Sequence, residues 1–284
     1  MFKLHFLPFI LFLLLAGSSM ALAEKLTYDT ANILEADIVS LYNPLGISLS
    51  AKAYHRQIYH HDAAVLWDGL YYQWGGQANI NPAFSRFGVH AEWLPVAVVK
   101  LAVQYDRLFF SGNNGSLLAF VSSNDAFGDD ALKAMEGDEV SAEGERKLLH
   151  ITLQAKVDNI VVRNITDISD YKFPGNAAYY LEREYEILLA KDDQLISNQL
   201  YLLFEHINAT GNKRYLGPYH DYIHGKKSGL TRERLGVTWF QQYTTALAGI
   251  QNPRWYLQSG IYLQDPNRQD EFYLVFGIGG DFEW

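Results

Sequence analysis

The stretch "FYLVFGIGGDFEW" at residues 272–284 alternates between two kinds of side chain. With a period of two, Asp281 and Glu283 fall on a face with Tyr273, and the opposite face is apolar to its last residue. Chain ends in water tend to fray and carry polar residues, so an apolar terminal strand favours contact with lipid. The apolar face comprises Phe272, Leu274, Phe276, Ile278, Gly280, Phe282 and Trp284.

The N-terminal stretch "MFKLHFLPFILFLLLAGSSMALA" has the features of a secretory signal peptide. Lys3 precedes an apolar run at 6–16, and Ala21 and Ala23 form an A-x-A cleavage site. The run is too short for a spanning helix. We therefore expect a signal peptide at 1–23 and a single mature domain at 24–284.

Composition excludes several classes of protein. The chain has no cysteine, which rules out disulfides, thiolate chemistry and a lipid anchor on cysteine. Its formal net charge of −9 makes nucleic acid a poor partner. With 19 Tyr, 16 Phe and 6 Trp, the chain is rich in the rings that form girdles at membrane interfaces. Since no later stretch approaches a spanning helix, membrane insertion would require a closed barrel.

Alternating segments predict about twelve antiparallel strands, an even number that is typical of an up-and-down transmembrane β-barrel. The clearest hairpin joins "RWYLQSGIYLQ" to the terminal strand through "DPNRQD". A secreted soluble sandwich or a lipocalin-like barrel would share this alternation. The predicted strands are 32–42, 47–57, 69–80, 84–93, 98–110, 147–157, 160–168, 179–190, 194–206, 232–242, 254–264 and 272–284.

Loop lengths predict the orientation of such a barrel. If the terminal strand runs toward the periplasm, the segments 111–145, 169–178 and 206–231 become outer loops. The connections at Leu94-Pro95, Asp158-Asn159 and Lys191–Gln194 then become periplasmic turns, and long outer loops with short periplasmic turns are usual in these barrels.

The terminal alternation resembles the C-terminal signature strand of Gram-negative outer-membrane β-barrel proteins. Trp284 is last, Phe282 is third from the end, and Ile278, Phe276 and Leu274 continue the apolar face. The resemblance implies recognition by the barrel-assembly machinery and a location in the bacterial outer membrane. Gly280 departs from the usual bulky residue, and the resemblance covers only this strand.

The predicted inward faces carry charges of both signs. They predict either a sealing network of ion pairs or a constriction that selects small polar solutes. Three glutamates and Tyr180 on one predicted strand favour cations or neutral molecules, and inward arginines and lysines are the expected partners of these glutamates. The candidate pore-lining residues are Arg86, His90, Glu92, Lys100, Asp106, Glu182, Glu184, Glu186, Arg232 and Arg234.

An outer-membrane lipid hydrolase, such as a phospholipase or lipid A deacylase, is the competing function. In "FEHINATGNK", His206 is a weak candidate base and Thr210 a weak candidate nucleophile, but no serine stands beside them. His220 and His224 in "HDYIH" have a spacing that suits a metal only in a helix, so we expect no metal and no cofactor.

We therefore rank a porin-like passive channel first, a purely structural barrel second and a hydrolase third. The expected partners are outer-membrane lipid, small polar solutes and lipopolysaccharide. The basic, aromatic segment "GNKRYLGPYHDYIHGKKSG" is the candidate contact for lipopolysaccharide phosphates.

Deleting Phe282–Trp284 should block outer-membrane assembly far more than replacing Asp281 and Glu283 together, because only the deleted aromatic rings are predicted to face lipid. Membrane fractionation and heat-modifiable gel mobility measure assembly. Equal assembly of the two variants would contradict the predicted faces.

Overall fold

The computed structural model describes residues 29–60, 66, 69–113, 116–247 and 249–283. The predicted signal peptide at 1–23 lies outside the described residues. Among the described residues, no helix is long and apolar enough to cross a membrane.

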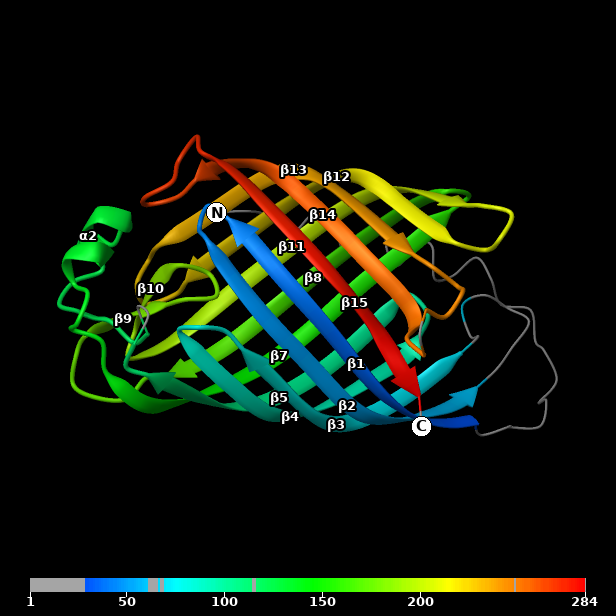
Figure 1. Cartoon of the computed structure of the whole chain (residues 1–284), viewed down its shortest axis with the longest axis horizontal. Coiled ribbons are helices and arrows are strands. Elements are labelled where there is room, and N and C mark those ends of the chain that lie inside the picture. Colours follow the sequence, from blue (N-terminus) through cyan, green and yellow to red (C-terminus); the bar gives the residue numbers. More distant parts are fainter. Residues whose placement is uncertain (1–28, 61–65, 67–68, 114–115, 248, 284) are drawn as a thin grey trace, which may run out of the picture.

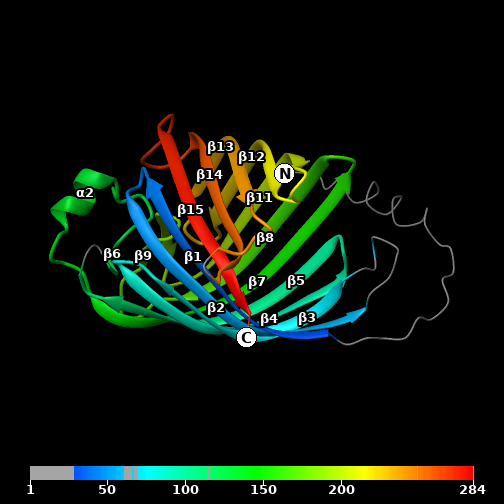
Figure 2. The same cartoon turned by 45° about the vertical axis from the view of Figure 1, so that its right-hand side comes forward.

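Twelve strands close into one antiparallel barrel. Figure 1 and Figure 2 show the closed wall that they form. Each strand pairs with two neighbours, and β1 pairs with β15, so the barrel has no open edge. The predicted twelve-strand barrel is therefore confirmed. The barrel strands are β1 (Asp29–Tyr42), β2 (Gly46–His60), β3 (Leu70–Ile80), β4 (Phe84–Val96), β5 (Val99–Ser111), β7 (Ser141–Val157), β8 (Ile160–Lys172), β11 (Asp192–Ile207), β12 (Lys213–Gly225), β13 (Thr231–Gln242), β14 (Gln251–Gln264) and β15 (Phe272–Glu283).

The outer surface of the barrel is apolar. On β15, Phe272 is 51% exposed and Phe276 is 44% exposed, whereas inward Tyr273 is 1% exposed. The predicted faces of the terminal strand are thus confirmed for Phe272 to Phe282, and Trp284 lies outside the described residues. The rings of Trp239 and Trp255 pack together near one end of the barrel, with 5.1 Å between their centroids. An aromatic girdle would meet the membrane interface at this position. A closed barrel with this exterior satisfies its backbone groups internally and belongs in the bacterial outer membrane.

The two ends of the barrel differ in their connections. The long segments 112–140 and 173–191 lie at one end, which we call the loop end and assign to the cell exterior. They contain β6 (Ala119–Phe120), α2 (Asp129–Ala134), β9 (Tyr179–Glu182) and β10 (Ile187–Ala190). Figure 1 shows α2, β9 and β10 together at this end. The beginning of β1 and the end of β15 mark the opposite, periplasmic end.

The structure corrects the predicted outer loop at 206–231. This segment contains β12, which pairs with β11 and β13 along its length. Its basic residues therefore separate: Lys213 begins β12 at the periplasmic end, and Lys226 follows β12 at the loop end. The described basic residues of the segment therefore lie at two ends of the barrel, and contact with lipopolysaccharide stays a prediction. His220 and His224 lie on a strand rather than in a loop, and their rings alternate with the buried Asp221 and Ile223.

The predicted strand at 179–190 is also wrong. These residues form the β9–β10 hairpin, which pairs with β6 in a separate three-stranded sheet. Lys191–Gln194 consequently lies at the loop end, where β11 begins, and is no periplasmic turn. The predicted number of strands was correct because one false strand replaced the missed β12.

Arg254 joins the two ends of the chain at the seam between β1 and β15. Its guanidinium donates to Glu35 Oε1 at 2.9 Å, to Asp37 Oδ2 at 2.9 Å and to Asp281 Oδ1 at 2.7 Å. Gly279 makes this possible, since a Cβ there would lie 1.9 Å from the Asp37 carboxylate. One side chain on β14 therefore holds carboxylates from the first and last strands.

Replacing Arg254 with methionine should lower the free energy of unfolding by about 3 kcal/mol, because three inward carboxylates lose their shared cation. Urea unfolding in lipid vesicles measures the loss. Arg107→Gln is the matched control, since the Arg107–Glu145 pair is half exposed and such pairs contribute about 0–1 kcal/mol. Equal losses in the two variants would contradict the role of Arg254 at the seam.

Candidate functional site

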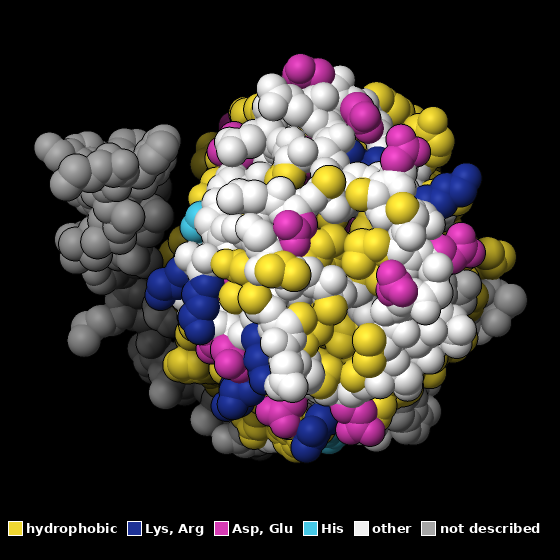
Figure 3. Space-filling view, turned by 90° about the vertical axis from the view of Figure 1, so that its left-hand side faces the viewer, with side chains coloured by type: hydrophobic (Ala, Val, Ile, Leu, Met, Phe, Trp, Pro, Cys, Tyr) yellow, Lys and Arg dark blue, Asp and Glu magenta, His cyan; other side chains and the backbone are white. Residues whose placement is uncertain are grey.

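The extracellular mouth of the barrel is filled by the β9–β10 hairpin, which we call the plug (residues 179–190). Ile187 and Leu189 are fully buried against barrel residues such as Phe84 and Leu108. Leu181 and Leu188 pack in a second cluster with Leu118, Phe120 and Phe127 of the 112–140 connection. The plug is therefore apolar on both faces. Figure 3, which looks onto the loop end, shows atoms across the mouth and no open hole.

Ion pairs attach the plug to the barrel wall. Glu184 Oε2 lies 2.5 Å from Arg86 Nη1 and 3.5 Å from Arg146 Nη1. Arg146 also binds Asp106, whose side chain is completely buried, at 2.9 Å. Arg232 donates to the backbone carbonyl of Tyr185. The expected pairing of a glutamate with an inward arginine is thus observed for Glu184 and Arg86, but it joins the plug to β4.

The rim of the plug carries a second set of polar contacts. Arg268, in the β14–β15 connection, lies 3.0 Å from Glu186 and 2.6 Å from Asp129 at the start of α2. Glu182 is 5% exposed, accepts a hydrogen bond from the Tyr185 N–H at 2.7 Å, and faces the Tyr171 hydroxyl at 3.4 Å. The three glutamates therefore belong to a hairpin and its turn, with separate partners, and do not line one strand.

The carboxyl groups of the plug differ in their affinity for protons. Burial raises the pKa of Glu182 to about 7, and the neighbouring Glu184 carboxylate contributes to the rise. Burial also acts on Glu184, but Arg86 and Arg146 outweigh it and hold the pKa of Glu184 below its usual value. Glu184 is thus the charged anchor of the plug, and Glu182 is the group that titrates near neutral pH.

Below the plug, the wall of the lumen carries ion pairs from neighbouring strands. Asp221 on β12 lies 2.7 Å from Arg234 and 4.0 Å from Arg232, both on β13. Glu92 on β4 lies 3.3 Å from Lys100 on β5. The structure thus places Arg232, Arg234, Glu92 and Lys100 on the inner surface, each beside a partner.

His90 and Arg163 stand apart from this pairing. His90 is 8% exposed, and neither of its ring nitrogens has a hydrogen-bond partner among the described residues. The buried Nε of Arg163 on β8 likewise has none there. Lys52 on β2 was not among the predicted pore-lining residues, and neither were Arg146 and Arg163. The alternation of their strands would have placed all three inward.

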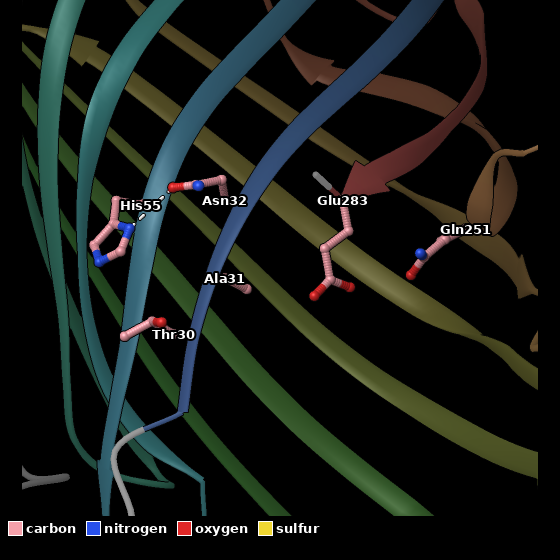
Figure 4. Close-up of a pocket in the computed structure, with 6 residues that line it drawn as sticks. All are labelled: Thr30, Ala31, Asn32, His55, Gln251 and Glu283. Atoms are coloured by element: carbon pink, nitrogen blue, oxygen red, sulfur yellow. Dashed lines mark hydrogen bonds between the residues drawn. The ribbon is translucent and has the colours of Figure 1, made fainter.

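A polar pocket of about 270 Å³ lies at the periplasmic rim, and Figure 4 shows its lining. His55 Nδ1 lies 2.9 Å from Asn32 Oδ1 on one side of β1, and Glu283 and Gln251 of the last two strands lie on its other side. A second pocket of about 230 Å³ shares Gln251 and Glu283 and reaches Arg254 and Arg56 on the inner wall. The periplasmic mouth is therefore polar, in contrast to the plugged mouth.

The weak catalytic candidates do not form a catalytic pair. His206 lies near the periplasmic end of β11, and Thr210 lies in the following turn, where its hydroxyl donates to Asn208 Oδ1 at 2.8 Å. Within the described part of the chain, no hydrogen bond joins His206 to Thr210. No group of three or more metal-ligating side chains occurs among the described residues either.

Comparison with known proteins gives similarity of fold only. No protein-family profile matches the chain, and no curated protein matches it in sequence. The β domain of the Bordetella autotransporter BrkA is 10% identical, with a TM-score of 0.41 over 89% of this chain and 98% of that one. An outer membrane channel from Pseudomonas putida F1 is 11% identical, with a TM-score of 0.40 over 92% of this chain and 97% of that one. The outer membrane protein OmpT of Vibrio cholerae is 9% identical, with a TM-score of 0.37 over 94% of this chain and all of that one.

Proposed function

We propose that this barrel is a porin-like channel for small polar solutes, and that its extracellular mouth is closed here by the plug. The supporting observation is the contrast between the two halves of the interior. The half near the loop end holds a hydrophobic core. The periplasmic half is lined by ionisable and amide side chains, and inward Lys52 is exposed to the lumen. A polar, solvated interior is the property that a solute path requires.

The plug is built so that it can leave without opening the barrel. Strands β6, β9 and β10 form hydrogen-bonded ladders only with one another, and the barrel ladder closes without them. Phe173 N–H donates to the Lys191 carbonyl at 2.8 Å, so the segment that carries the plug begins and ends at neighbouring points. Movement of the plug would therefore break side-chain contacts and leave the β-barrel intact.

Replacing residues 176–190 with a short glycine–serine linker should convert a mostly closed protein into one with steady, large conductance. The reason is that the linker removes the apolar side chains that fill the mouth and preserves the Phe173–Lys191 contact. Single-channel recording in planar bilayers measures the change.

The matched control replaces the turn at 208–212 with the same linker, because this turn joins β11 to β12 at the periplasmic end and its loss leaves the plug in place. This control should stay mostly closed. A plug-deleted barrel that folds, as judged by heat-modifiable mobility, and carries no current would refute the channel and favour a structural barrel.

Acidification should keep the plug closed. The docked plug raises the pKa of Glu182 from 4.5 to about 7, so the docked state binds the proton more tightly. Docking is then most favourable below pH 4.5 and weakens as the pH rises through 7. Wild-type channels should open more often at pH 8 than at pH 5.

Glu182→Gln should lose most of this pH dependence, whereas Asp130→Asn, a change of an exposed acid on α2, should retain it. Single-channel open probability at the two pH values measures both variants. Equal pH dependence in wild type and Glu182→Gln would show that another group controls the plug.

A further inference from the structure

Three cations on the lumen wall form few ion pairs for their number. They are Lys52 on β2, Lys100 on β5 and Arg163 on β8, all on inward positions of their strands. Lys100 has Glu92 at 3.3 Å. Among the described residues, neither Lys52 nor Arg163 has a carboxylate within ion-pair distance. The three cations therefore have one ion-pair partner between them, Glu92.

These side chains form one electrostatic cluster. Lys52 and Arg163 are both near enough to repel the ammonium of Lys100, and Glu92 attracts it. The charge of Lys52 is also near enough to interact electrostatically with the side chains of His90 and Glu92. Residues from β2, β4, β5 and β8 thus converge in the lumen below the plug.

Other carboxylates on the neighbouring strands contact other side chains. Glu35 is opposite Lys52 in the strand register but accepts from Arg254 at 2.9 Å. Asp106, which interacts electrostatically with His90, has its Oδ2 2.9 Å from Arg146 Nη2. Asp167, opposite His150, lies 2.6 Å from that ring. Among the described residues, none of these carboxylates lies within ion-pair distance of Lys52 or Arg163.

His90 supplies an independent observation at the same place. Its ring packs edge-on against the ring of Tyr54, with 6.0 Å between the two ring centroids. The side chain is more than nine-tenths buried, and neither ring nitrogen has a hydrogen-bond partner among the described residues. A neutral imidazole still has one N–H to donate, and a buried donor without an acceptor is costly. His90 and the three cations therefore all offer donors, whereas Glu92 in the same cluster already accepts from the Tyr71 hydroxyl at 2.6 Å and pairs with Lys100.

We propose that Lys52, His90, Lys100 and Arg163 form a binding site for small oxyanions, such as solutes that carry a phosphate or a carboxylate. This inference rests on the proposed channel and names its preferred solutes. Guanidinium and ammonium groups bind such anions through charge-assisted hydrogen bonds. An oxyanion site would reverse the preference for cations or neutral molecules that the sequence predicts. Two of the glutamates behind that prediction, Glu184 and Glu186, are paired with arginines and lie in the plug.

Binding of inorganic phosphate to the refolded barrel in detergent at low salt tests the site directly. Isothermal titration calorimetry should show saturable binding to the wild type. Lys52→Gln combined with Arg163→Gln should weaken the affinity at least tenfold. The control combines Lys147→Gln with Lys172→Gln, which removes the same charge from exposed positions on β7 and β8 and should leave the affinity unchanged.

No saturable binding to the wild type, or equal affinity in the two double variants, would overturn the proposed site. Heat-modifiable mobility confirms that each variant is folded before it is titrated.

Reversal potentials in a KCl gradient test the anion site and the channel as separate proposals. The plug-deleted barrel should prefer chloride over potassium, and Lys52→Gln with Arg163→Gln in that background should shift the preference toward potassium. A cation-selective plug-deleted barrel would refute the anion site and keep the channel. A folded plug-deleted barrel that binds phosphate and never conducts would refute the channel and keep the site.

Discussion

The hydrogen-bond ladder that closes between β1 and β15 is the constraint on which the rest of the structure depends. Hydrocarbon offers no partner to a backbone N–H or carbonyl, so every strand must have two neighbours. Closure also forces successive side chains to face lipid and lumen alternately. The outer positions must then be apolar, and charged residues such as Arg254 and Asp221 are confined to the interior, where each needs a partner.

This alternation explains which strands could be predicted from the sequence. The terminal strand, with Phe272 and Phe276 outside and Tyr273 inside, has one apolar face and a period of two. Strand β12 was missed because Gly217 and Pro218 resemble a turn and because polar His220 and Tyr222 occupy outward positions. The plug was mistaken for a barrel strand for the opposite reason. Its alternating residues are buried on both sides, Leu189 against the barrel and Leu188 against the 112–140 connection, and sequence periodicity cannot distinguish these surroundings.

The candidate site could likewise be predicted only in part. Alternation placed Arg86, His90, Glu92, Lys100, Asp106, Arg232 and Arg234 on inward positions, since that depends on local strand geometry. Their partners depend on segments distant in the sequence: Arg86 and Glu184 are 98 residues apart and meet only because a loop folds back into the barrel. The expected charge preference assumed three glutamates on one inward strand face, and the structure places them in the plug hairpin and its turn with separate partners. The sign of a lumen depends on which charges remain unpaired after folding, and Lys52 and Arg163 emerge only from that comparison.

The plug and the unpaired cations also affect each other physically. A hydrophobic core at the extracellular mouth keeps bulk water from that side of the lumen, and charges interact more strongly where water is scarce. With the plug docked, an anion near Lys52 and Arg163 would be attracted strongly and would approach through the polar periplasmic mouth near Arg254. Undocking the plug would admit water and salt, which screen the same cations and weaken their hold. The site would then bind tightly when the barrel is closed and release readily when it is open, as conduction through a binding site requires.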